Sequence, residues 1–389
     1  MLGNFHHRRI LLLILIVGLF LRVVLVVGGG DLVDSSDAAH WDGTARAYWL
    51  TGLLHTDGGT YRPPLFPLML AAVYGLVGHQ VEFARLVQTV IGTLTCLVCF
   101  ALGRRLGGAG TGLVAAALAA LYPLFILFST VLMAETLLIA LVGTCLWLGA
   151  RWEEQSTAGS AACLGVGIGL AALCKPVVLA WLPFLIGGRL RRSGQWRHAL
   201  VVLLAAGLVI LPWSLRNLAQ TGHFVPISSN VGVNLFIGHE PEAAGGYRAG
   251  VDYFALAADY IDRPADPVLL DRMMALQALR WIAADPLRTV GLGLRKLLIF
   301  WSPAPAEVGP LEVLIGLATT GPLLALGCTG AWQLRHRTEV WHLLSLALAL
   351  SLVHMIFFSH TRFRLPVDVA LIAPAAFGLI ELWKRWLRP

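Results

Sequence analysis

Charged residues are scarce in this sequence. They make up only 13% of the 389 residues, whereas soluble domains contain about a quarter. Hydrophobic residues account for 57%, and they gather in runs such as residues 10–27, which at about 18 residues can cross a membrane once as a helix. This composition excludes an ordinary soluble domain. It predicts an all-α polytopic membrane protein.

Other features are also absent or weak. The six cysteines all lie in apolar segments, so the CxxC spacing of Cys96 and Cys99 fits two small residues on one helix face better than redox or metal chemistry. No disulfides are expected. The sequence contains no internal repeat, coiled coil or low-complexity linker. The net charge of +7 comes from short basic clusters between apolar runs, which does not indicate nucleic-acid binding.

The basic clusters set the expected topology. Residues 64–78 form an apolar run of about 15 residues, too short to cross comfortably. If this run stays at the membrane surface, the later basic clusters all face the cytoplasm, as the positive-inside bias requires. They are residues 104–105, 151, 189–197, 335–337 and 384–388. The prediction is ten spans, with an error of about two, and both termini inside.

Three regions follow from this topology. Residues 1–212 form an N-terminal transmembrane core that begins with an uncleaved helix and contains a first outer loop at 29–82. Residues 213–310 form a large outer loop, in which 287–301 reads as an interfacial amphipathic helix. Residues 311–389 form three closing spans. Arg22, near the outer end of the first helix, is expected to snorkel toward the membrane surface, with lining of the site as the alternative.

The first outer loop carries the most suggestive polar residues. Asp37 could remove a proton from a hydroxyl, and Arg62 could bind phosphate oxygens with its planar fork. Trp41 and Tyr61 are expected to support them. Two plainer interpretations remain open: Asp37 could cap a surface helix, and Arg62 could snorkel to lipid headgroups.

Further polar residues fall on the same outer face. Arg362 and Arg364 run against the positive-inside bias, and phosphate binding would explain them. Lys175 and Arg216 could serve the same purpose, while Glu135 is expected to pair with one of these cations. The remaining candidates for a supporting role are Asn230, Asn234 and His360.

Several motifs resemble a known family. Asp37-x-x-x-Trp41-x-x-x-Ala45 and the stretch Tyr61-Arg62-Pro63-Pro64 resemble the first-loop motifs of GT-C membrane glycosyltransferases. The similar branch contains glycosyltransferase family 39, the lipid A aminoarabinose transferases and the RgtA/B/C/D-like proteins. Further matches are Ala134-Glu135-Thr136-Leu137, Lys175-Pro176, Pro212-Trp213-Ser214-Leu215-Arg216-Asn217, the run 224–235 and Arg362-Phe363-Arg364-Leu365-Pro366.

The resemblance implies an inverting transfer of a sugar from a polyprenyl-phosphate donor to a lipid, glycan or protein acceptor. The reaction would occur on the outer face of the cytoplasmic membrane, in cell-envelope modification. It implies that Asp37 is the general base and that Arg62 contacts the donor phosphate. Trp41 stands where the family usually has Tyr, so it is expected to pack. No DxD-type acidic pair suggests a metal, and no cofactor is expected.

Two other functions remain open at this stage. A transporter or flippase for lipid-linked sugars would use similar cations but needs no base, and such proteins often show repeats. A polymerase or ligase of the O-antigen type would use a diphosphate donor and would lack the first loop led by Asp37.

Overall fold

The computed structural model describes residues 2–29, 36–51, 59–304 and 309–387. Asp34 of the first outer loop lies outside the described residues. Nearly every regular element in these ranges is a helix, and the exception is an isolated parallel bridge between Gly246 and Ser359. The helices are α1 (Leu2–Gly28), α2 (Ser36–Thr51), α3 (Leu65–Val77), α4 (Val81–Leu121), α5 (Pro123–Thr130), α6 (Glu135–Gln155), α7 (Ala158–Cys174), α8 (Leu182–Ser193), α9 (Trp196–Thr221), α10 (Val231–His239), α11 (Tyr253–Ala257), α12 (Pro267–Ala284), α13 (Pro286–Trp301), α14 (Pro310–Gln333), α15 (Thr338–Ile356) and α16 (Leu365–Trp386), with 3-10 turns η1 (Pro176–Trp181) and η2 (Thr361–Arg364).

Seven helices within the described residues are long and apolar enough to span a membrane. They are α1, α4, α6, α9, α14, α15 and α16 with its preceding turn. The expected total of ten is therefore not confirmed. Two shorter apolar helices, α3 and α7, accompany them, and α3 is the run that was expected to be too short to cross.

The long helix α4 reverses direction partway along. Gly107 and Gly108 have non-helical backbone angles, with φ of +83° at Gly108, a region that glycine enters without steric cost. A Cβ on Gly112 would lie 2.8 Å from the carbonyl oxygen of Phe100, so the two arms pack closely against each other. The bend follows directly after the basic cluster at residues 104–105.

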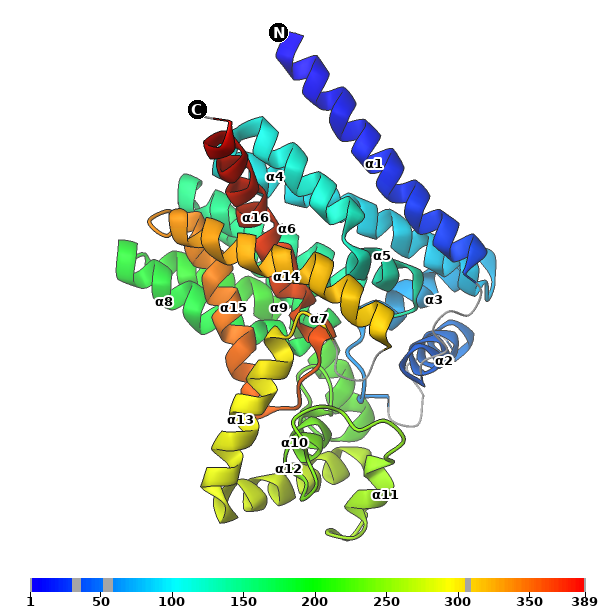
Figure 1. Ribbon diagram of the computed structural model, residues 1–389. Coiled ribbons are helices and arrows are strands. Elements are labelled where there is room, and N and C mark those ends of the chain that lie inside the picture. Colours follow the sequence, from blue (N-terminus) through cyan, green and yellow to red (C-terminus); the bar gives the residue numbers. More distant parts are fainter. Residues whose placement is uncertain (1, 30–35, 52–58, 305–308, 388–389) are drawn as a thin grey trace.

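Close helix packing builds the bundle in Figure 1. The C-terminal helix α16 packs against both α4 and α14, and α7 packs against α9. Small residues make these approaches possible: a Cβ on Gly165 would lie 2.4 Å from the carbonyl oxygen of Val202, and one on Gly330 would lie 2.0 Å from that of Pro374. Membrane helices commonly associate through such small residues, because the backbones can then approach closely.

Arg22 does not snorkel, so that prediction is wrong. Its side chain is fully buried and donates hydrogen bonds to the carbonyl oxygens of Ala120 at 3.1 Å and Ala119 at 3.3 Å. These carbonyls belong to the last turn of α4, where the helix offers them no further N–H partner. The guanidinium group supplies that partner, which ties α1 to the end of α4.

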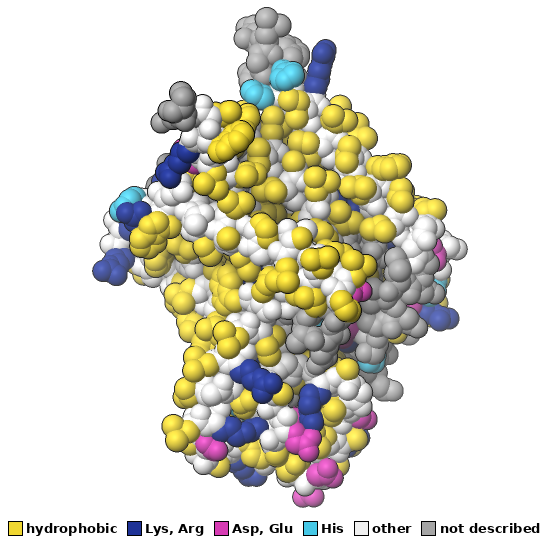
Figure 2. Space-filling view, in the orientation of Figure 1, with side chains coloured by type: hydrophobic (Ala, Val, Ile, Leu, Met, Phe, Trp, Pro, Cys, Tyr) yellow, Lys and Arg dark blue, Asp and Glu magenta, His cyan; other side chains and the backbone are white. Residues whose placement is uncertain are grey.

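The segment after α9 forms a separate group of helices. α10, α11 and α12 lie together at the lower end of Figure 1, and α13 connects them to the bundle. Charged side chains gather over this end, whereas the surface over α1 and α14 is mostly hydrophobic (Figure 2). The boundary expected at residue 213 falls inside α9, which continues to Thr221. The helix expected over 287–301 is present as α13.

Candidate active site

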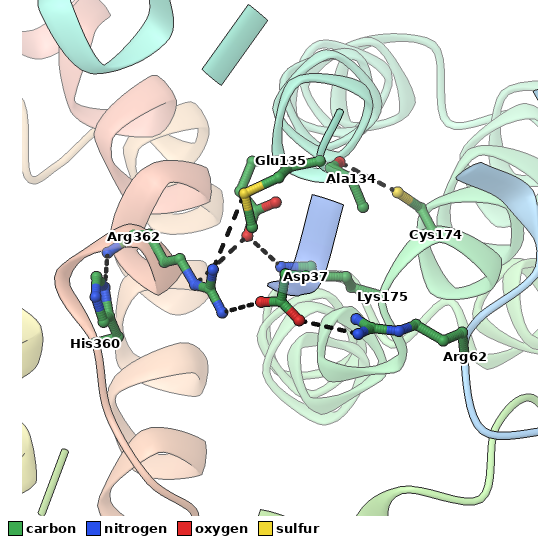
Figure 3. Close-up of polar contacts among 9 residues, drawn as sticks. Asp37, Arg62, Ala134, Glu135, Cys174, Lys175, His360 and Arg362 are labelled. Carbon is green, nitrogen blue, oxygen red and sulfur yellow. Dashed lines mark hydrogen bonds and ion pairs between the residues drawn. The ribbon is translucent and has the colours of Figure 1, made fainter. Parts of the chain in front are cut away.

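Asp37 lies in the first turn of α2, and its carboxylate contacts two arginines. Oδ1 accepts a hydrogen bond from Arg62 at 2.9 Å, and Oδ2 accepts one from Arg362 at 2.8 Å. Figure 3 shows the carboxylate between the two guanidinium groups. Because α2 begins at Ser36, Asp37 lies inside the helix and is not its cap. The two arginines come from sequence positions 325 and 25 residues away, so only the fold brings this group together.

The two arginines control the charge of Asp37. Burial alone would raise the pKa of this carboxyl, but the nearby guanidinium groups of Arg362 and Arg62 outweigh burial and hold the pKa well below its usual range. Asp37 is therefore ionised at neutral pH in the free protein.

Arg62 is held by aromatic rings as well as by Asp37. Its guanidinium carbon lies 4.5 Å from the centre of the Trp41 ring and 5.7 Å from that of Tyr61, distances at which a cation is attracted to the ring face. Trp41 is only 4% exposed and meets Phe66 edge-on at 5.4 Å. Trp41 thus packs, as predicted, and Arg62 points into the site instead of toward lipid headgroups.

A second carboxylate adjoins the first. Glu135, at the start of α6, accepts a hydrogen bond from Lys175 at 2.6 Å, and the same oxygen lies 4.0 Å from Nε of Arg362. Its other oxygen is buried without a hydrogen-bond partner in the described chain. Three cations therefore face two carboxylates, which leaves one positive charge in excess. The predicted pairing of Glu135 with a cation is confirmed.

The loop between α15 and α16 positions Arg362 and His360. The backbone N–H of Arg362 donates to Nδ1 of His360 at 3.1 Å, so a neutral ring carries its proton on Nε2. Burial, reinforced by the positive charge of Arg362, lowers the pKa of His360 to about 4. His360 therefore stays neutral near pH 7.

These residues line one large cavity of about 1740 Å³. The side of the cavity toward the bundle includes apolar side chains, and the opposite side, away from the bundle and called the outer wall below, is lined by residues of the segment that contains α10, α11 and α12. Asn230 and Asn234 lie on that outer wall. The apolar side includes Leu138, Val177, Ala180, Val353 and Leu365.

Two predicted cations do not reach the cavity. Arg364 is fully buried, where Nε donates to Asp368 at 2.9 Å and Nη1 donates to the carbonyl oxygens of Phe300 and Ser302. The prediction that Arg364 binds phosphate is wrong, because the 3-10 turn directs Arg362 and Arg364 to different sides.

Arg216 also lies apart from the cavity lining. It donates to the carbonyl oxygen of Gly59 at 3.0 Å and to Asn217 at 2.9 Å, and it lies over the ring of Trp213. This places Arg216 as a link between α9 and the first outer loop, and the structure does not support phosphate binding by its side chain.

Sequence reasoning missed part of the outer wall. Tyr247, Phe254 and Asp271 line the cavity, yet each lies in a stretch without a recognisable motif. Tyr247 follows Gly245, which has φ of +95°. The pair Gly245-Gly246 was the one available signal, since glycine pairs often mark backbone that makes an unusual turn.

The carboxylates of the site have cations as neighbours. Within the described residues, no group of three or more His, Cys, Asp or Glu side chains could hold a metal ion. Both oxygens of Asp37 and one of Glu135 already contact Arg or Lys. Positive charge at this position disfavours a divalent cation and favours an anion.

Comparison with known proteins supports the architecture. Residues 61–215 match the family described as dolichyl-phosphate-mannose-protein mannosyltransferase. No curated protein matches the chain.

Several solved structures are similar to this one. The oligosaccharyltransferase AglB from Archaeoglobus fulgidus, in complex with an inhibitory peptide and a dolichol-phosphate, aligns with a TM-score of 0.60 and 16% identity over 98% of this chain and 51% of that one. An oligosaccharyltransferase from Archaeoglobus fulgidus tethered to an acceptor peptide aligns with a TM-score of 0.59 and 12% identity, over 98% of this chain and 50% of that one. ArnT from Cupriavidus metallidurans bound to undecaprenyl phosphate aligns with a TM-score of 0.48 and 18% identity, over 95% of this chain and 77% of that one.

This chain thus spans about half the length of the oligosaccharyltransferase chains to which it is similar. The fold is that of the GT-C membrane glycosyltransferases, as the sequence motifs implied.

Proposed function

We propose that this protein is an inverting glycosyltransferase that uses a polyprenyl-phosphate-linked sugar as its donor. The observation that carries the proposal is the contact of Asp37 with Arg62 and Arg362 in the lining of a large cavity that is also lined by apolar side chains. This arrangement combines a carboxylate base, phosphate-binding cations and room for a lipid chain. The family match over residues 61–215 supports it.

The cations suit the leaving group. A phosphate leaving group becomes a stable anion when the glycosidic bond breaks, so it needs positive charge rather than an acid. Arg62, Arg362 and Lys175 supply that charge, with one positive charge in excess over Asp37 and Glu135. A phosphodiester carries one negative charge and matches this excess, whereas a diphosphate carries more. The charge balance favours a monophosphate donor over the diphosphate donor of an O-antigen-type polymerase or ligase.

Donor binding would also activate the base. In the free protein, Arg62 and Arg362 both bind the carboxylate of Asp37. A donor phosphate competes for the same guanidinium groups, and each contact that Asp37 loses raises its pKa and its basicity. The base would therefore become effective only when the donor is in place.

The reaction follows from these positions. Asp37 accepts the proton of an acceptor hydroxyl, whose oxygen forms a bond to the anomeric carbon of the donor sugar. The bond from that carbon to the phosphate oxygen breaks, and its electron pair stays on polyprenyl phosphate between Arg62, Arg362 and Lys175. Attack from the side opposite the phosphate inverts the anomeric carbon.

A transfer assay tests this proposal. Purified protein in detergent is given polyprenyl-phosphate-linked hexoses and pentoses with a membrane lipid and glycan extract, and released polyprenyl phosphate is measured. Release that depends on the extract is expected, and it should persist with EDTA because the proposed mechanism needs no metal. Donor that is bound but never cleaved under any of these conditions would contradict transfer and favour a transporter.

We further propose that the cavity opens on the outer face of the cytoplasmic membrane. The basic clusters of the bundle support this orientation under the positive-inside rule. A single cysteine placed at Tyr260, on a variant without the native cysteines, should react with an impermeant reagent added to intact cells. A cysteine at Arg192 should react only after the cells are opened, and the reverse pattern would contradict the orientation.

A further inference from the structure

The outer wall of the cavity is rich in aromatic side chains. Tyr61 and Phe254 meet edge-on with ring centres 6.0 Å apart, and Tyr247 lies 5.4 Å from Tyr253 and 5.9 Å from Phe358. Tyr61, Tyr247, Tyr253, Phe254 and Phe358 all line the same cavity. They face it beside the charged residues of the site, on the side away from the apolar bundle wall.

Tyr247 is fixed in position by its backbone. The N–H of Ser359 donates to the carbonyl oxygen of Gly245 at 2.9 Å, and Gly246 pairs with Ser359 in the parallel bridge. This pairing joins the segment to the loop that carries Arg362. Tyr247 as a whole residue nevertheless remains 42% exposed, unlike Tyr253 beside it at 5%. An aromatic side chain with exposed surface therefore lies next to the loop that carries Arg362.

Hydrogen-bonding groups surround this aromatic surface. Asn230, Asn234, Asp252 and Asp271 line the same wall. Asp271 already accepts a hydrogen bond from the N–H of Val233 at 2.9 Å, and Asn230 accepts one from Ser228 at 3.1 Å. The side-chain amide of Asn234 makes no hydrogen bond within the described chain. It can offer both a donor and an acceptor to a ligand.

We propose that this wall binds the acceptor and that the acceptor is a carbohydrate, with Tyr247 stacking on a sugar ring and Asn234 hydrogen bonding to its hydroxyls. The proposal rests on the proposed function, because it places the acceptor opposite the donor phosphate. One face of a sugar ring presents C–H groups, which are attracted to the electron-rich face of an aromatic ring. The ring edge presents hydroxyls, which match amide and carboxylate side chains.

A peptide acceptor fits the wall less well. Strand addition is one way to hold an extended peptide through its backbone, and the described residues form no strand beyond the single Gly246–Ser359 bridge. Without a strand edge, the backbone C=O and N–H groups of a bound peptide would have to find their hydrogen-bond partners among side chains. The described wall offers aromatic faces and a few short polar groups, which is the chemistry of carbohydrate binding.

The test measures acceptor and donor binding separately. The full chain in detergent, saturated with decaprenyl monophosphate, is applied to immobilised oligosaccharides of hexoses, heptoses and amino sugars, and to Ser- and Thr-containing peptides. Binding to at least one oligosaccharide is expected. Tyr247→Ala should weaken that binding about tenfold or more, because the stacking surface is lost. Tyr247→Phe keeps the ring and should stay within about threefold of the unmodified protein.

Tyr260→Ala is the matched control, because Tyr260 is 39% exposed in the same outer segment but does not line the cavity. It should leave oligosaccharide binding unchanged. Binding of peptides alone, of no oligosaccharide, or of oligosaccharides equally well by Tyr247→Ala would overturn the carbohydrate proposal. Decaprenyl monophosphate binding is measured in parallel and should be the same in all three variants. Failure of the unmodified protein to bind this lipid would instead count against the proposed function.

Discussion

The two ends of α6 carry two similar charge clusters with different surroundings. Glu135 begins the helix and Glu153 lies near its end, about 27 Å away along the axis at 1.5 Å per residue. Each glutamate pairs with basic residues from distant parts of the chain. Glu135 contacts Lys175 and lies near Arg362, whereas Glu153 contacts Arg189, Arg192 at 2.7 Å and His342 at 3.4 Å.

The two clusters differ in whether their charged side chains face a cavity that could hold a ligand. The side chains of Arg189 and His342 are 5% and 1% exposed, and Arg189 also donates to Ser156 and to Gln195 at 2.8 Å. The third partner, Arg192, has a side chain that is 31% exposed, but no member of that cluster lines the 1740 Å³ cavity. The cluster around Asp37 has side chains 17–30% exposed and faces the cavity. Charge alone therefore does not identify a site, whereas charge beside an open cavity does.

The largest expected effect concerns Asp37. Asp37→Asn keeps the size of the side chain but removes the base, so turnover in the transfer assay should fall about 10²–10⁴-fold. Donor binding should survive, since both arginines remain. Asp42→Asn is the control: Asp42 lies on the same helix, bonds to Tyr74 and His79 and does not line the cavity. Near-normal turnover of Asp37→Asn would remove Asp37 from the reaction.

The next effect concerns donor affinity at Arg62. Arg62→Ala should weaken donor binding about 10- to 100-fold, the equivalent of a lost charge-assisted hydrogen bond. The donor affinity of Arg62→Lys should lie between those of Arg62→Ala and the unmodified protein, because lysine keeps the charge but loses the planar fork. Arg46→Ala removes an exposed charge from α2 and should have no effect. Equal donor affinity in Arg62→Ala and Arg46→Ala would show that Arg62 does not bind the donor.

A smaller effect concerns pH. The active form of Asp37 is ionised, so kcat/KM should fall as the pH drops through its pKa in the free enzyme. Because Arg362 and Arg62 hold this pKa well below its usual range, the fall should begin only below about pH 4. Arg362→Gln removes one of these charges, so the fall of kcat/KM on the acid side should move to higher pH by about one pH unit. An unchanged pH dependence would mean that Arg362 does not control Asp37.

The smallest effect on activity is expected at the Glu153 cluster. Glu153→Gln leaves Arg189 without its carboxylate in a buried setting, which should destabilise the fold by about 3 kcal/mol and lower the melting temperature. Turnover per folded molecule should stay within about twofold of the unmodified protein. A large loss of turnover with an unchanged melting temperature would show that the Glu153 cluster takes part in the reaction and does not serve stability alone.

The sequence indicated which residues gather at the cavity better than it indicated which nearby residues stay out of it. Asp37, Arg62, Glu135, Lys175 and Arg362 were singled out with the help of motifs and His360 from its place on the predicted outer face, and the structure brings all of them to one cavity. Arg362 and Arg364 could not be separated in advance, because both are arginines in one short loop. Only the 3-10 turn decides which of them meets Asp368 in the interior.

Buried charge was the main source of error. Arg22 resembles a snorkelling residue by position, and its role depends on the carbonyl oxygens of Ala119 and Ala120, about a hundred residues away. The outer wall was missed for a similar reason. Tyr247 reaches the cavity through a backbone bridge to Ser359, which no local pattern in the sequence indicates.

Native mass spectrometry with decaprenyl monophosphate tests the central claim most directly, because it counts bound lipid phosphate without requiring a known acceptor. The unmodified protein should retain one lipid per chain. The double variant Arg62→Ala/Arg362→Ala, at the Asp37 cluster, should lose it, while Arg191→Ala/Arg192→Ala, at the Glu153 end, should retain it. Equal retention by both double variants would contradict the assignment of the Glu135 end of α6 as the donor site.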